Sequence, residues 1–168
     1  CDFINNSSVP GMIAVMAHIP NYTVTGCTFE NFSTVIYTAL DNSALGTVNV
    51  SNNTFAKVAE LYTGYWGKEN ANAVLTISNN KATDDSTTVI NVYDYAKETI
   101  GATATAFNKV TVTDNDAKVI LTNYDTNDFT ATISGNDSVV YTYKSKALLD
   151  SVDYPKTKVY VGYNSDNE

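Results

Sequence analysis

The chain has 168 residues, a net charge of −8 at pH 7 and only 17% charged residues. All ten basic residues are lysine, so the acidic, arginine-free surface excludes nucleic acid and anionic membranes as expected partners. No apolar run reaches the roughly 18 residues of a membrane span, so we expect no membrane insertion.

A six-residue segment recurs five times along the chain. It starts with an aliphatic anchor, and Cys or Asn follows three residues later. The anchors are Val24, Val50, Ile77, Val112 and Ile133, and Cys1–Phe3 is a truncated further copy. The intervals between anchors are 26, 27, 35 and 21 residues. Self-similarity at such a period is typical of a solenoid in which each repeat is one coil.

Two strands are predicted in most repeats. The first ends at the anchor and alternates apolar with polar residues, as in Thr47–Val50, which indicates a strand with one buried face. The second is predicted at Ile13–Met16, Thr34–Tyr37, Glu60–Tyr62, Thr88–Tyr93, Val119–Leu121 and Val139–Tyr141. A third, weaker strand precedes each anchor, and Ala96–Ala106 is an inserted loop or an extra strand.

Two columns of equivalent residues follow from the repeat. The turn column consists of Cys1, Cys27, Asn53, Asn80, Asn115 and Asn136. We expect its Asn residues to adopt the left-handed conformation of a sharp turn, and their amides to hydrogen-bond from coil to coil. Two residues later, a second column contains Phe3, Phe29, Phe55, Ala82, Ala117 and Ser138.

Segments such as Val50–Phe55, together with the coil length, resemble the right-handed parallel β-helices of the pectin-lyase-like superfamily. The resemblance implies an all-β, right-handed parallel β-helix of about five to six coils. The coils would span residues 1–143, and residues 144–168 would form a C-terminal cap and polar tail. The main alternative is an antiparallel β-sandwich, which the register of about 26 residues disfavours.

The two ends of the chain carry further expectations. Lys144–Asp150 is predicted as a short helix and Lys158–Tyr163 as a final strand of the cap. Cys1 is either the lipid-anchored residue of a bacterial lipoprotein or a boundary within a longer repeat region. Cys1 and Cys27 share a repeat position, so a disulfide and two stacked thiols both stay open.

The resemblance also implies what an enzyme of this fold would need. Such polysaccharide lyases use a carboxylate cluster for calcium and a basic residue as proton abstractor, and the related hydrolases use several Asp residues, a His and an Arg-x-Lys element. This chain has no Arg, and its single His18 lies in an apolar run where we expect it to pack within a strand. We leave the question of an enzyme open and lean towards a non-catalytic protein.

Asp114, Asp116 and Asp137 are the candidate metal ligands. Asp116 and Asp137 share a repeat position, so stacking would bring two carboxylates close enough to favour a bound cation. Calcium, which takes oxygen ligands, is the one cofactor considered, and the alternative is that these are solvated turn residues.

Aromatic residues provide the candidate ligand site, because the chain holds twelve Tyr and one Trp. The proposed sugar-binding residues are Tyr62, Tyr65, Trp66, Asn91, Tyr93 and Tyr95. Alternation would place Asn91, Tyr93 and Tyr95 on one face and Val92 on the other. Flat rings cover the apolar side of a sugar while amides bond its hydroxyls. The alternative is that these rings pack within loops or cover strands.

The expected function is therefore a non-catalytic extracellular module that binds a polysaccharide or another glycan, or mediates adhesion, through exposed aromatic residues. The resemblance is strongest to surface and polysaccharide-utilisation proteins of gut bacteria, which implies a cell-surface location. The alternative function is a polysaccharide lyase or glycoside hydrolase that uses calcium.

Overall fold

A computed structural model gives the fold of the chain. It describes residues 1–68, 70, 72–84, 88–94, 109–123, 130–143, 148–152 and 157–161. Within these ranges the regular structure consists of strands, with no helix. The inserted segment expected at Ala96–Ala106 lies outside the described residues.

The strands form two sheets, here called sheet A and sheet B. Sheet A has nine strands: β1 (Asp2–Ile4), β2 (Gly11–Ala17), β4 (Thr28–Ala44), β6 (Thr54–Lys68), β8 (Lys81–Ala82), β9 (Val89–Asp94), β11 (Lys118–Asn123), β13 (Ser138–Tyr143) and β15 (Thr157–Val161). Sheet B has six: β3 (Tyr22–Thr25), β5 (Thr47–Ser51), β7 (Val74–Ser78), β10 (Lys109–Thr113), β12 (Thr130–Ser134) and β14 (Leu148–Val152).

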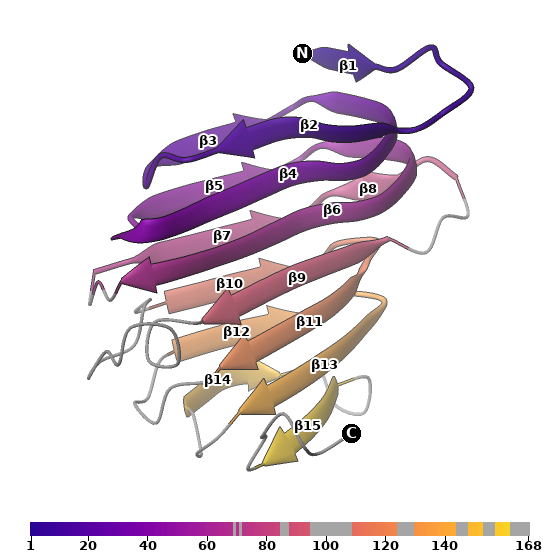
Figure 1. Cartoon of the computed structure of the whole chain (residues 1–168). Helices are drawn as coiled ribbons and strands as arrows, with labels where there is room; N and C mark the ends of the chain where they lie inside the picture. The colour runs from indigo at the N-terminus through magenta and orange to yellow at the C-terminus, as the bar shows by residue number, and fades with distance from the viewer. Residues whose placement is uncertain are drawn as a thin grey trace.

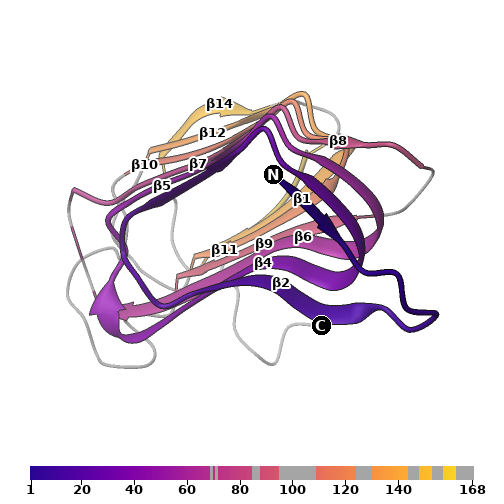
Figure 2. The same ribbon diagram turned by 90° about the horizontal axis from the view of Figure 1, so that it is seen from above.

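The chain winds between the two sheets as a solenoid (Figure 1). All strand pairs are parallel, and each strand pairs with the equivalent strand of the next coil. Seen from the N-terminal end, the chain runs clockwise while it recedes from the viewer (Figure 2), which is a right-handed winding. This architecture confirms the predicted parallel β-helix.

The strand register confirms the predicted repeat. The anchors form one continuous row across sheet B: Val24, Val50, Ile77, Val112 and Ile133. The row stays aligned although the intervals of 35 and 21 residues depart from the period. Four of the anchors are fully buried in the core between the sheets, and the first, Val24, packs against it.

The Phe column is confirmed in the first coils and shifts in the later ones. The rings of Phe3 and Phe29 are stacked, with centroids 5.0 Å apart, and Phe29 is in register with Phe55. In the later coils Ser138 pairs with Lys118 instead of Ala117, so the alignment predicted for Ser138 is wrong by one residue.

The turn column is a buried ladder of Asn side chains, as predicted. Asn80 shows the pattern, because its Nδ2 donates to Asn115 Oδ1 at 2.8 Å and to the Val50 carbonyl at 3.1 Å. Its Oδ1 accepts from the backbone N–H and the Nδ2 of Asn53, at 3.1 and 2.9 Å. The bonds continue from Asn115 to Asn136. Each amide thereby pairs backbone groups that the turn would otherwise bury unpaired.

The left-handed conformation predicted for the turn column is wrong by one residue. In five coils the residue directly before the column has a positive φ, between 55° and 66°: Gly26, Asn52, Asn79, Asp114 and Gly135. The physical reason is that the bend at the preceding residue turns the column side chain into the core. There its amide can reach the coils on both sides.

The helix predicted at Lys144–Asp150 is also corrected. Leu148–Val152 is strand β14, which pairs with β12 in sheet B, and Thr157–Val161 is β15, which pairs with β13 in sheet A. Residues 144–147 lie outside the described part of the chain. Parallel pairing therefore continues beyond residue 143.

The ladder predicts a large effect of Asn80→Ala on stability. The substitution would leave several buried donors and acceptors unpaired, each at a cost of about 1–3 kcal/mol. We expect the free energy of unfolding, measured by urea denaturation, to fall by about 3 kcal/mol. The matched control is Asn72→Ala, at an exposed turn residue, where we expect a change within about 0.5 kcal/mol. Equal effects of the two substitutions would contradict the ladder's role.

Candidate functional site

The candidate site lies on sheet A, where the predicted aromatic positions come together. The register sets Tyr65 of β6 beside Tyr93 of β9, and Trp66 beside Asp94. Paired positions of neighbouring strands lie about 4.8 Å apart, so these four residues form one patch of the backbone. The side chains of these four residues, and all of Tyr95, lie outside the described part of the structure.

A row of polar side chains lies beside this patch. Glu60 on β6 is half-buried, and its Oε2 accepts a hydrogen bond from Thr34 Oγ1 of β4 at 3.0 Å. Its Oε1 accepts a hydrogen bond from Asn91 Nδ2 of β9. One carboxylate therefore links three neighbouring strands, which fixes its orientation on the sheet.

Alternation on β9 is confirmed for the described residues. Asn91 is half-buried, and the next residue, Val92, is fully buried in the core. The polar row therefore belongs to the outer side of sheet A, and the apolar residues between belong to the inner side.

Tyr62 is the residue that the structure places elsewhere than expected. Its side chain is fully buried in the core, as is that of the preceding residue, Leu61. The register shifts at this point, because Glu60 pairs with Val89 while Tyr62 pairs with Ile90. The irregularity brings two consecutive side chains inward, so Tyr62 does not belong to an exposed aromatic row.

The hydroxyl of Tyr62 lies in a polar corner of the core. A Cβ at Gly64 would collide with this hydroxyl, so the close approach requires glycine at that position. Nearby, the Tyr22 hydroxyl and Thr38 Oγ1 hydrogen-bond to each other. Among the residues that the structure describes, the Tyr62 hydroxyl has no hydrogen-bond partner of normal geometry. Burial holds the pKa of Tyr62 well above its ordinary value.

The predicted metal ligands are all exposed, at turns between sheet B and sheet A. Asp114 has a left-handed backbone, and its carboxylate lies against Gly135 of the next coil. Asp137 donates its backbone N–H to the Ala117 carbonyl at 3.2 Å. Because Ser138 pairs with Lys118, Asp137 is aligned with Ala117 and not, as predicted, with Asp116. Within the described residues no three His, Cys, Asp or Glu side chains are grouped to hold a metal ion. Calcium binding stays a prediction.

A pocket of about 390 Å³ opens near the start of the sheet A strands. It is lined by Thr88, Val89, Lys118, Asp137 and Ser138. Since Val89 pairs with Glu60, the pocket adjoins the polar row on the same sheet.

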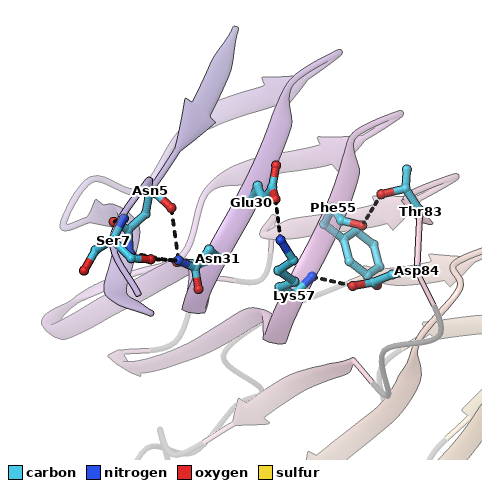
Figure 3. Close-up of polar contacts among 8 residues, drawn as sticks. All are labelled: Asn5, Ser7, Glu30, Asn31, Phe55, Lys57, Thr83 and Asp84. Atoms are coloured by element: carbon cyan, nitrogen blue, oxygen red, sulfur yellow. Dashed lines mark hydrogen bonds and ion pairs between the residues drawn. The ribbon is translucent and has the colours of Figure 1, made fainter. Parts of the chain in front are cut away.

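A second turn column, missed in the sequence, lies where sheet A bends. Asn31 and Lys57 are in equivalent positions there and both have positive φ, of 66° and 52°. Lys57 Nζ forms an ion pair with Glu30 Oε1 at 2.9 Å, and the Lys57 backbone N–H donates to Asp84 Oδ2 at 2.7 Å (Figure 3). The available signal was the recurrence of polar residues two positions after the Phe column: Asn5, Asn31, Lys57 and Asp84.

The structure also describes the single histidine and the two cysteines. His18 follows β2, is exposed, and donates from Nδ1 to the Ala39 carbonyl at 3.0 Å, so the expected packing within a strand is wrong. Cys1 is exposed and Cys27 is buried, and both are free thiols. The Cys27 thiol donates to the Thr25 carbonyl of its own coil at 3.4 Å.

Together these features define a right-handed parallel β-helix whose outer face carries a fixed polar row. The sequence matched no protein-family model and no curated protein, and no solved structure matched the chain. The described part of the chain contains no helix with the length and apolar character of a membrane span.

The buried hydroxyl of Tyr62 predicts a change in alkaline stability. Below about pH 10 the phenol is protonated in both the folded and unfolded states. Above it the unfolded state loses its proton first, because the folded-state pKa is raised, so stability falls with pH. We expect Tyr62→Phe to reduce this fall by up to about 1.4 kcal/mol per pH unit. The free energy of unfolding measured by urea denaturation between pH 9 and 11 tests this, and identical slopes would contradict it.

Proposed function

We propose that this protein is a non-catalytic extracellular β-helix of the pectin-lyase-like type, and that it binds glycans on the outer face of sheet A. The observation that carries the proposal is the register that sets Tyr65 beside Tyr93, at positions that alternate onto the same face as Asn91. This concentration of aromatic positions adjoins the row formed by Thr34, Glu60 and Asn91. Aromatic rings with convergent polar groups are what sugar recognition requires.

The polar row supports this proposal by its fixed geometry. Glu60 receives hydrogen bonds from both sides along the direction in which the coils stack. A carboxylate held in this way accepts hydrogen bonds from ligand hydroxyls without losing side-chain freedom on binding. The adjoining pocket at Lys118 and Asp137 would lengthen the surface, so that a chain of several sugar units could lie across the strands.

The charge of the protein supports neutral glycans as ligands. With a net charge of −8 and no arginine, the surface disfavours uronic acid and sulfate groups. The proposed location is the outside of a bacterial cell, where a surface or adhesive protein would encounter polysaccharide.

The proposal predicts that aromatic substitutions weaken glycan binding. Soluble neutral polysaccharides, such as galactomannan and xyloglucan, and acidic ones, such as polygalacturonate, would be compared by affinity electrophoresis and then by calorimetry. We expect Tyr65→Ala and Tyr93→Ala to weaken binding about fivefold each, which corresponds to about 1 kcal/mol per ring. Lys57→Ala, an exposed residue near the start of β6, should leave the affinity unchanged.

Two outcomes would contradict the proposal. The first is that no polysaccharide slows the migration of the unaltered protein in affinity electrophoresis, or that the aromatic variants bind with the same affinity as the unaltered protein. The second is that the protein cleaves a polysaccharide, measured by the appearance of new reducing ends, and that Asp114→Ala or Asp116→Ala abolishes this cleavage. That result would favour the alternative of a lyase or hydrolase.

A further inference from the structure

Glu60 is a carboxylate whose hydrogen-bond partners in the described structure are neutral. Its Oε2 accepts from the Thr34 hydroxyl at 3.0 Å, and its Oε1 accepts from the Asn91 amide. The side chain is half-buried on the outer side of sheet A. A partly buried charge is stabilised by an opposite charge nearby, and neutral donors compensate only part of the hydration it has lost. The position therefore favours a cation.

No cation of the protein fills this role in the part of the chain that the structure describes. The one ion pair found there joins Lys57 to Glu30, at the bend of sheet A. Lys118 belongs to the same row of the sheet as Glu60, but Val89 of β9 separates the two positions, and they form no ion pair. A positive charge beside Glu60 would therefore come from a ligand.

Two further oxygen atoms beside Glu60 lack a hydrogen-bond partner among the described residues. They are Thr63 Oγ1 and Asn91 Oδ1, and both atoms are buried. Thr63 and Asn91 occupy paired positions on β6 and β9, and the Asn91 amide also bonds to Glu60. The three side chains are here called the acceptor trio. Buried acceptors that stay unpaired reduce stability, so the acceptor trio lacks donors as well as a positive charge.

An ammonium group supplies both of these better than a hydroxyl does. A protonated amine carries a full positive charge and three N–H donors. A sugar hydroxyl offers one donor, and an N-acetyl group offers one N–H without a charge. Hydrogen bonds between a cation and a carboxylate are about twice as strong as those between neutral groups. The net charge of −8, without arginine, also attracts a cationic ligand.

We propose that the glycan bound on sheet A contains an amino sugar with a free, protonated amine, and that the acceptor trio binds this amine. The assignment of the sugar class rests on the glycan-binding function proposed above. Tyr65 and Tyr93 occupy the next outward positions of the same two strands after Thr63 and Asn91. The sugar ring would lie against these aromatic positions while its amine enters beside the half-buried Glu60.

Calorimetry with two oligosaccharides of equal length, one of glucosamine and one of N-acetylglucosamine, tests the proposal. The whole chain is titrated at a mildly acidic pH, at which the glucosamine amines are protonated. We expect the glucosamine oligomer to bind about tenfold more tightly. Glu60→Gln keeps the shape of the side chain and its ability to accept hydrogen bonds. It should abolish this preference and change the affinity for the N-acetylated oligomer by less than about twofold.

The matched control is Glu30→Gln, which removes the same charge from β4 at the bend of the sheet and should leave the preference intact. Equal losses in the two glutamine variants would mean that the overall charge attracts the amine, and would overturn the proposal. Thr63→Val removes an unpaired hydroxyl at nearly constant shape, so we expect unchanged thermal stability and about threefold weaker binding of glucosamine. Circular dichroism establishes that each variant retains the fold.

The amino-sugar assignment and glycan binding itself can fail separately. Equal affinity of the unaltered protein for the two oligomers, or no binding of the glucosamine oligomer, would overturn the assignment. Glycan binding on sheet A would still stand if neutral polysaccharides bind and the Tyr65 and Tyr93 variants weaken that binding.

Discussion

The ladder of Asn side chains is the interaction on which the rest of the structure depends. A solenoid with a tight turn beside its core buries backbone N–H and C=O groups that no strand can pair. Asn is suited to this position, because one short side chain offers a donor with two protons and an acceptor with two lone pairs. The amides of Asn53, Asn80 and Asn115 each bond to the coil before and the coil after, and Asn136 bonds back to the coil before it. The ladder therefore fixes the register of successive coils.

Because the ladder and the anchors fix the register, the connections between strands are free to vary. The intervals of 35 and 21 residues change the length of a coil, yet Ile77, Val112 and Ile133 remain aligned. On the outer face of sheet A, Glu60 can bridge from Thr34 to Asn91 because β4, β6 and β9 are adjacent parallel strands. The proposed binding surface is thus a consequence of core packing.

The features that could be predicted from the sequence were those that recur in every coil, at the repeat interval and in columns of equivalent residues. Anchors, second strands and the amide ladder all repeat, so they show in the pattern. Tyr62 could not be placed, because the irregular register beside Leu61 breaks the alternation that the prediction assumed. The strand at Leu148–Val152 follows a stretch rich in Lys, Ala and Leu, whose intrinsic preference is helical, and pairing with β12 overrides that preference. Side-chain orientation at a bend, as at Asn52, depends on contacts with other coils.

The N-terminal end shows how the same ladder determines the character of an edge. At the turn column the first coils carry Cys1 and Cys27 in place of Asn. The Cys27 backbone N–H still donates to Asn53 Oδ1 at 3.0 Å, but its thiol turns to a carbonyl of its own coil. The polar ladder therefore ends one coil before the edge. In the first coil Phe3 stacks on Phe29, and the uncharged strand β2 pairs with β4, so this coil is held to the next one by apolar packing and strand pairing and not by side-chain amides.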